Sequence, residues 1–164
     1  MGTGKSSVGR DLAAWTGLPL YDTDWMIACR VGLSIPEIFS QRGEEEFRAC
    51  ETEALTQLPP VAAIVVTGGG IVLRPENVAR LRELGAVVNL TADEETLFAR
   101  VSRRSTRPLL QTPDPRGTLT ELLQTREPLY REAADFTVDT SELTHHEVAD
   151  AVLRGVEELQ HHVR

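Results

Sequence analysis

Residues 1–9 of the chain read Met1-Gly2-Thr3-Gly4-Lys5-Ser6-Ser7-Val8-Gly9. Gly4-Lys5-Ser6 is the closing half of the phosphate-binding pattern G-x-x-x-x-G-K-[ST], in which backbone N–H groups and the start of the following helix surround a polyphosphate. Glycine lets the backbone approach phosphate oxygens, lysine supplies a mobile positive charge, and the serine hydroxyl can ligate Mg²⁺. Lys5 is also the only lysine in the chain. The stretch predicts a nucleotide-binding loop followed by a helix.

The glycine that opens this pattern would lie three residues before Gly2, and an apolar strand normally leads into such a loop. That strand is usually central and buried in a parallel sheet, so its loss would cost more than the ~5–15 kcal/mol by which a domain is stable. We therefore expect the working protein to start upstream of Met1.

Length and composition bound the class of protein. With 164 residues, 41% of them hydrophobic, the chain is expected to be one globular domain, residues 1–164. No apolar run approaches the ~18 residues of a membrane span and no leader precedes the loop, so we expect a cytoplasmic protein without a membrane partner. The net charge of −8 speaks against nucleic acid as a partner. Cys29 and Cys50 lack metal or redox spacing and are expected to be buried or inert thiols.

Apolar periodicity and turn residues predict an α/β arrangement with short parallel strands. The expected helices cover residues 5–16, 28–58, 75–84, 93–104, 119–134 and 144–162, and the expected strands cover residues 18–21, 61–66, 86–90 and 136–139. Ser34 is the expected N-cap of a helix within residues 28–58, where Pro36 fits an early helical position. Pro128 is expected to kink or divide the helix over residues 119–134.

Two polar or glycine-rich stretches follow predicted strands. Asp22-Thr23-Asp24 follows the first strand, and ligands of open α/β sheets collect at the carboxyl ends of strands. The alternative is that these residues cap a helix beginning near Trp25. Gly68-Gly69-Gly70 follows the second strand, and successive glycines suit a ligand that lies against bare backbone N–H groups. A plain flexible turn is the alternative there.

Arginines supply further candidate contacts. Arg48 and Glu51 are spaced i, i+3 on a predicted helix, so their pairing would hold the guanidinium in one pose; a surface ion pair worth at most ~1 kcal/mol is the alternative. The segment from Arg103 to Gly117 combines arginines with proline and glycine, which favours a mobile lid over phosphates or, failing that, a solvated run of charge. The adjacent histidines at 145–146 and 161–162 point to different helix faces, which does not favour a metal site.

Taken in order, the motifs resemble those of the shikimate kinase family over essentially the whole chain. They are Gly4-Lys5-Ser6, Asp22-Thr23-Asp24, Gly43 with Glu46-Phe47-Arg48, Gly68-Gly69-Gly70, Arg107-Pro108-Leu109-Leu110 and Arg126-Glu127-Pro128-Leu129-Tyr130. The resemblance implies a three-layer P-loop NTPase fold of the nucleoside-monophosphate-kinase type, in which helices flank a parallel sheet. It also implies a mobile lid at about residues 103–117 and a substrate-binding helical region at about residues 24–58.

The same resemblance implies roles for individual residues. The catalytic residues would be Lys5, Asp24 as base, and Arg107 from the lid; one Mg²⁺ would be held by Ser6 and Asp22. ATP would be bound by Gly2, Thr3, Gly4, Lys5, Ser6, Ser7, Arg100 and Arg107, with Arg100 stacked on the adenine. Shikimate would be bound by Asp24, Arg48, Gly68, Gly69, Gly70 and Arg126, with Glu51 orienting Arg48.

The resemblance thus implies a monomeric enzyme that phosphorylates the 3-hydroxyl of shikimate with ATP, a step of chorismate and aromatic amino acid biosynthesis. Two alternatives stay open. One is another small-metabolite kinase on the same scaffold, such as a gluconate kinase, and the other is a degenerate nucleotide-binding copy without catalysis. The sequence departs from the family pattern at Ser7, where threonine is commoner, and in lacking a proline at the adenine loop.

Overall fold

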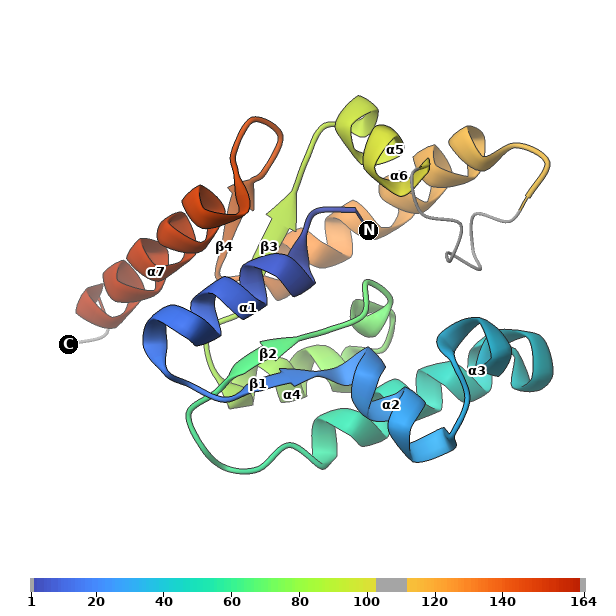
Figure 1. Ribbon diagram of the computed structural model, residues 1–164, viewed down its shortest axis with the longest axis horizontal. Coiled ribbons are helices and arrows are strands. Elements are labelled where there is room, and N and C mark those ends of the chain that lie inside the picture. The colour runs from blue at the N-terminus through green and yellow to red at the C-terminus, as the bar shows by residue number, and fades with distance from the viewer. Residues whose placement is uncertain (1, 103–111, 163–164) are drawn as a thin grey trace.

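The computed structural model describes residues 2–102 and 112–162, and Figure 1 shows the ribbon with its elements labelled. The α-helices are α1 (Lys5–Thr16), α2 (Thr23–Val31), α3 (Ile35–Thr56), α4 (Pro75–Leu84), α5 (Glu94–Ser102), α6 (Pro115–Ala133) and α7 (His145–His162), with a 3-10 turn η1 (Ile71–Leu73). The strands are β1 (Leu20–Asp22), β2 (Ile64–Val66), β3 (Val88–Thr91) and β4 (Phe136–Asp139). This alternation of strands and helices confirms the α/β class predicted from the sequence.

The described strands form two parallel pairs. β1 pairs with β2 in the register Leu20 to Ile64, and β3 pairs with β4 in the register Val88 to Phe136. The sequence predicted one parallel sheet; among the described residues β2 and β3 are not hydrogen-bonded to each other, so the two pairs are separate. The strand expected ahead of the phosphate-binding loop lies outside the sequence and stays a prediction.

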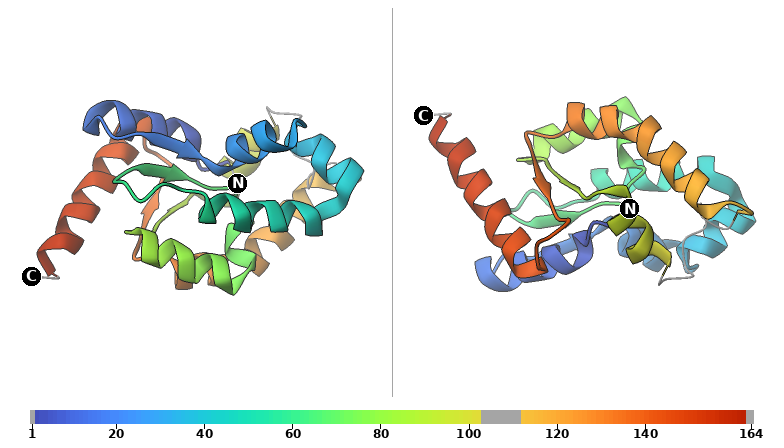
Figure 2. Two further views of the ribbon diagram at one scale, coloured as in Figure 1. Left: turned by 90° about the horizontal axis from the view of Figure 1, so that it is seen from below. Right: turned by 90° about the horizontal axis from the view of Figure 1, so that it is seen from above.

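Helices cover both faces of the strands. Figure 2 shows α1 on one face, with α7 beside it at one end, and α4 and α6 on the opposite face. α2 and α3 form a helical lobe beyond the carboxyl ends of β1 and β2 (Figure 1). The layers place the start of α1, the end of β2 and the helical lobe around a common centre.

Apolar side chains from the two strand faces enter different clusters. On one face, Val8 of α1 and Val148 of α7 pack with Ile64, Val88 and their neighbours. On the other face, residues of α3, η1, α4 and α6 pack with the strand residues Tyr21 and Val65. Neighbouring strand residues therefore serve opposite faces, as the pleat of a strand requires.

Several boundaries differ from the prediction. β1 and β2 are shorter than expected because pairing begins where the Ile64 N–H donates to the Pro19 carbonyl at 2.9 Å, and Val61, bent into a turn, stays 56% exposed. α2 begins at Thr23 instead of near Trp25. Within α3, Gly43 has φ 83° and ψ 172°, so the helix is broken there into two pieces.

The region predicted as a lid at residues 103–117 is corrected at its carboxyl end. Residues 103–111 lie outside the described part of the chain, whereas Pro115 begins α6 and Asp114 caps it by accepting a hydrogen bond from the Gly117 N–H at 2.9 Å. Proline is favoured in the first turn of a helix, because its missing N–H is not needed there. Pro128 does not divide α6, which continues to Ala133.

Two further findings concern the thiols and the helices. The thiols were expected to be buried or inert: Cys50 is buried, whereas Cys29 is exposed on α2, and both are free. Helical periodicity predicts on which face of a helix a residue lies, but not whether another element covers that face.

None of the described helices has the length and apolar character needed to span a membrane.

Gly9 gives a test of how α1 packs on the strands. A Cβ at this buried position would overlap the Val66 side chain and approach Leu20 Cδ1 at 3.3 Å. Alanine in place of glycine normally stabilises a helix by roughly 0.5–1 kcal/mol, whereas overpacking a core costs about 1–3 kcal/mol. We expect Gly9→Ala to lower the free energy of unfolding, measured in urea.

The control for Gly9→Ala is Ala14→Gly, at an exposed position of the same helix. This substitution should cost only the difference in helix propensity, about 0.5–1 kcal/mol. A stabilised Gly9→Ala protein would contradict the close packing of α1 on β2.

Candidate active site

The phosphate-binding pattern forms a tight turn that leads into α1. Gly2 and Gly4 have φ angles of 79° and 86°, in the left-handed region that side chains with a Cβ rarely adopt. Gly4 caps α1, and its carbonyl accepts a hydrogen bond from the Ser7 N–H at 2.9 Å. Backbone N–H groups at the start of a helix favour a bound anion. Lys5 and Ser6 line a cavity at this end of α1.

Asp22 links this turn to α2. Its Oδ1 caps α2 by accepting hydrogen bonds from the N–H groups of Asp24 at 3.0 Å and Trp25 at 3.3 Å. Its Oδ2 accepts a hydrogen bond from the Ser6 hydroxyl at 3.4 Å. The helix-cap reading of this acidic stretch is therefore confirmed for Asp22, and the ligand reading stays a prediction. A hydroxyl and a carboxylate oxygen held this close form a hard-oxygen donor set, which fits Mg²⁺.

Asp24 and Glu51 meet at Gly68, where β2 has ended. A Cβ built on Gly68 would lie 2.7 Å from Asp24 Oδ1 and 2.7 Å from Glu51 Oε1. Glu51 is fully buried, and within the described part of the chain its Oε1 has no hydrogen-bond partner. Two acidic side chains from α2 and α3 thus converge on the wall of the cavity.

Arg48 is fixed by a buried ion pair on α3. Its Nη1 donates to Glu51 Oε2 at 2.6 Å, and its Nη2 donates to Glu44 Oε1 at 2.6 Å. Its guanidinium carbon lies 5.8 Å and 5.3 Å from the ring centroids of Phe39 and Phe47, within cation–π range. The alternative of a surface ion pair is wrong, because Arg48 is only 6% exposed.

Burial and pairing act in opposite directions on these two groups. Burial raises the pKa of the Glu51 carboxyl, and the Arg48 guanidinium offsets this only in part. Burial also opposes the charge on Arg48, but hydrogen bonds and charges from Glu51 and Glu44 raise the Arg48 pKa above its ordinary value. Arg48 is therefore a permanent cation at the cavity wall.

Each glycine of the turn after β2 accommodates a different polar side chain. Gly68 faces Asp24 and Glu51, as described above. A Cβ on Gly69 would lie 3.2 Å from the Tyr130 hydroxyl, and a Cβ on Gly70 would overlap the Arg48 guanidinium. The sequence interpretation of bare backbone against a ligand is thus incomplete. Side chains from three helices pack against this turn, and glycine is required there because a Cβ would collide with them.

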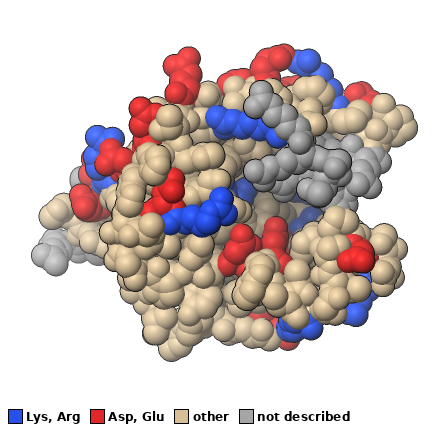
Figure 3. Space-filling model, viewed as in Figure 1, with Lys and Arg blue, Asp and Glu red and all other residues tan. Residues whose placement is uncertain are grey.

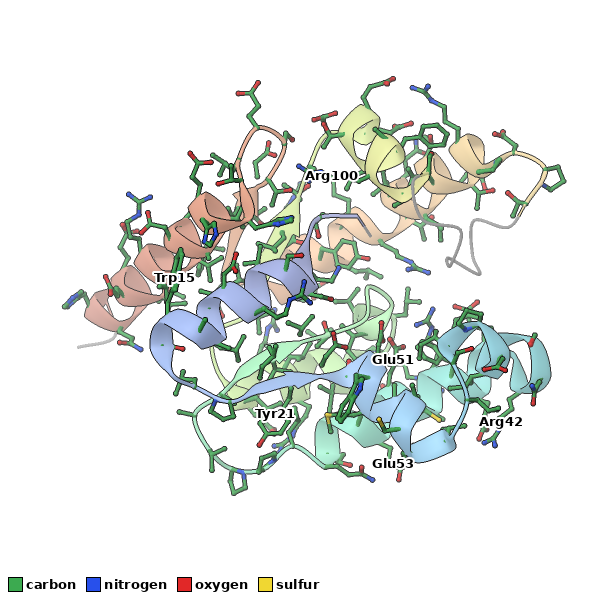
Figure 4. All side chains as sticks on the ribbon, in the orientation of Figure 1. Trp15, Tyr21, Arg42, Glu51, Glu53 and Arg100 are labelled. Atoms are coloured by element: carbon green, nitrogen blue, oxygen red, sulfur yellow. The ribbon has the colours of Figure 1, made fainter. Side chains whose placement is uncertain are left out.

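Arg126, Arg100 and His145 also line the cavity. Arg126 is a buried residue of α6. Arg100 of α5 donates to Thr140 Oγ1 at 3.0 Å and to the Thr140 carbonyl at 2.8 Å, which fixes its guanidinium after β4. His145 begins α7, and its ring lies 3.1 Å from a Cβ built on Gly4. In Figure 4, Glu51 and Arg100 are labelled on opposite sides of the site.

These groups surround one cavity of about 460 Å³. The predicted site residues that line it are Gly2, Gly4, Lys5, Ser6, Ser7, Asp22, Asp24, Arg48, Gly68, Gly69, Gly70, Arg100 and Arg126. Thr3 is absent from this lining, and its side chain is buried at 4% exposure. Arg107, the predicted lid residue, lies outside the described part of the chain. Figure 3 shows basic and acidic side chains inside the hollow on this face.

Sequence reasoning missed several residues of this site. Phe39 and Phe47 support the Arg48 guanidinium, and His145 borders the phosphate-binding turn. The spacing of the two phenylalanines along the helix predicts only that they pack in the apolar core. His145 follows Thr144, which forms a capping box with Glu147, so the cap could have located the start of the helix but not its neighbour Gly4. His146 instead stacks on Trp15, at a centroid distance of 5.5 Å.

Comparison with known proteins identifies relatives over the length of the chain. The family model described as Shikimate kinase matches residues 1–157. Shikimate kinase from Thioalkalivibrio sulfidiphilus is 46% identical over all of this chain and 83% of that protein. Shikimate kinase from Thermodesulfovibrio yellowstonii is 44% identical over 97% of this chain and 92% of that protein.

Solved structures give the same family. Shikimate kinase from Acinetobacter baumannii, in complex with shikimate, matches with a TM-score of 0.90 and 38% identity, covering 96% of this chain and 89% of that one. A gluconokinase from Sinorhizobium meliloti matches with a TM-score of 0.56 and 19% identity over 99% of this chain and 90% of that one, a likeness of fold alone. The family model, the full-length relatives and the closely superposing structure together establish that this chain belongs to the shikimate kinase family.

Proposed function

We propose that this chain transfers the terminal phosphoryl group of ATP to the 3-hydroxyl of shikimate, giving 3-phosphoshikimate and ADP. The observation that carries the proposal is that Lys5, Asp24, Arg48 and Arg126 line one cavity. A nucleotide-binding turn and a pair of guanidinium groups suited to an organic acid therefore face the same space. Family membership supports the choice of reaction.

In the proposed reaction the nucleotide phosphates lie against Gly2–Ser7 at the start of α1. In phosphoryl transfer the protein takes little part in covalent chemistry. It catalyses the reaction mainly by positioning the two substrates and by neutralising charge on the transferred phosphoryl group. Lys5 supplies a positive charge there, and Arg107 is proposed to add a second. Ser6 and Asp22 would hold one Mg²⁺ ion, which when bound neutralises charge on the phosphates. Arg100 is proposed to flank the adenine, its guanidinium oriented by Thr140.

On the substrate side, Asp24 is proposed to bind the shikimate hydroxyls and to accept the proton of the one that attacks. Arg48 and Arg126 are proposed to bind the carboxylate, with the buried Glu51 orienting Arg48 and Gly68–Gly70 bordering the ring. Charge-assisted hydrogen bonds of this kind are worth ~1.5–3 kcal/mol each. A neutral analogue would lack these charge-assisted hydrogen bonds, which would distinguish shikimate from a sugar.

A coupled assay of ADP release tests the proposed substrate. With Mg-ATP we expect ADP release in the presence of shikimate and background release with gluconate or without an acceptor. Release with gluconate and none with shikimate would overturn the proposal. Thermal unfolding with and without Mg-ATP tests the nucleotide site separately, since a bound ligand raises the melting temperature. No shift at millimolar nucleotide would favour the degenerate copy.

Arg126→Ala tests the carboxylate site. Removing one charge-assisted hydrogen bond of ~1.5–3 kcal/mol should raise the KM for shikimate about 10- to 100-fold, while the KM for ATP changes little. The matched control is Arg131→Ala on the same helix, where the side chain is 78% exposed and pairs with Glu127. Equal KM values for shikimate in the two variants would remove Arg126 from the substrate site.

Gly70→Ala tests whether the pose of Arg48 governs substrate binding. Its Cβ would displace the guanidinium from Glu51, so we expect the Kd for shikimate, measured by calorimetry, to rise about tenfold or more. Gly69→Ala, whose Cβ meets only the Tyr130 hydroxyl at 3.2 Å, should have a smaller effect. Unchanged binding in Gly70→Ala would mean that Arg48 does not hold the carboxylate.

A further inference from the structure

Tyr130 connects α6 to the glycine turn after β2. Its hydroxyl donates a hydrogen bond to the Gly69 carbonyl at 2.6 Å, between residues 61 positions apart in the sequence. The tyrosine does not line the main cavity, whereas Gly69 does. The hydroxyl therefore ties α6 to the glycine turn, close to the Arg126 and Arg48 guanidinium groups whose charges act on it.

The hydroxyl is a donor over the physiological pH range. Burial raises the pKa of Tyr130, and the nearby positive charge of Arg126 offsets this only in part. A protonated hydroxyl has one proton to donate, and the Gly69 carbonyl accepts it. The hydrogen bond is thus maintained while the groups around it bind or release anions.

This hydrogen bond fixes the direction of a peptide group. A trans peptide is planar, and its N–H points opposite to its C=O. Because the Gly69 carbonyl points towards Tyr130, the N–H of Gly70 in the same peptide points to the opposite side. Rotation of this peptide would cost the Tyr130 hydrogen bond.

Tyr130 also lies one helical turn beyond Arg126. Residues four apart on a helix project from the same face, so α6 presents Arg126 and Tyr130 side by side. Leu129 and Tyr130 pack against the cluster that includes Ile71 and Val72 of η1, immediately after the glycines. Packing and hydrogen bond together set the separation between the glycine turn and the Arg126 guanidinium.

We propose that Tyr130 is a positioning residue for shikimate, which it does not itself contact. Its hydroxyl orients the Gly69–Gly70 peptide relative to Arg126, so that the backbone N–H and the guanidinium address one ligand together. The assignment rests on the proposed function for the identity of that ligand. The competing explanation is that Tyr130 only fills the apolar cluster, in which case phenylalanine would serve equally well.

Tyr130→Phe removes the hydroxyl and keeps the ring. Loss of one neutral hydrogen bond, about 1 kcal/mol, corresponds to about fivefold, so we expect the Kd and the KM for shikimate to rise about three- to tenfold. The Kd for ATP should change less than about twofold, because the phosphate-binding turn is not involved. A purely structural role would lower the melting temperature without separating the two ligands.

Tyr21→Phe is the matched control. Tyr21 is the other tyrosine of the chain and packs in the same apolar cluster from β1. Shikimate binding should be unchanged in this variant. If Tyr130→Phe binds shikimate as tightly as the wild-type protein and Tyr21→Phe do, the positioning role is excluded. If wild-type protein binds no shikimate in the calorimeter, the proposed function falls and this role falls with it, so the two failures are distinguishable.

A double-mutant cycle tests the route of the effect. A Cβ on Gly69 would press on the Tyr130 hydroxyl at 3.2 Å, so Gly69→Ala should weaken shikimate binding through the same contact. If that is so, Gly69→Ala should weaken binding less in the Tyr130→Phe background than in wild type, because the crowded hydroxyl is gone. Effects that simply multiply would show that the two residues act independently, and would overturn the proposal.

Discussion

The buried ion pair between Arg48 and Glu51 is the constraint on which the site depends. Removing Arg48 would leave Glu51 as a buried carboxylate without its partner, at a cost of about 3–5 kcal/mol. The ion pair needs space for the Arg48 guanidinium next to the turn after β2. Gly70 provides this space because it has no Cβ, which would overlap the guanidinium. Glu44 adds a second carboxylate at the more exposed edge of the guanidinium. Arg48 nevertheless lines the cavity.

The glycine turn after β2 follows from the same constraint. Side chains from α2, α3 and α6 all reach this turn, so a single Cβ at any of the three positions would meet one of them. Asp24, Arg48 and Tyr130 belong to segments far apart in the sequence, and their common neighbour is a backbone that takes up almost no space. The turn thus brings the substrate-side groups close together before any ligand arrives.

Local signals predicted the local features of this fold. Ser34 caps α3 together with Glu37, and α4 covers Pro75–Leu84 as expected, because caps, proline and glycine act on their own neighbourhood. The cavity residues were identified through ordered motifs. The roles of Tyr130 and His145 were not, since periodicity gives the face of a helix without naming the element opposite it. The division of the strands into two pairs likewise depends on partners across space.

The chain has a net charge of −8, yet both proposed ligands are anions. An acidic chain would repel both ATP and an organic acid if charge acted uniformly, but exposed charges are screened beyond about 8–10 Å at physiological salt. Lys5, Arg48, Arg100 and Arg126 all border a single cavity, so their fields act there at short range and largely out of solvent. The acidic groups nearest to them are engaged, with Glu51 on Arg48 and Asp22 on the cap of α2. The local arrangement of these side chains therefore outweighs the net negative charge of the chain, and anions are favoured where these cations line the cavity.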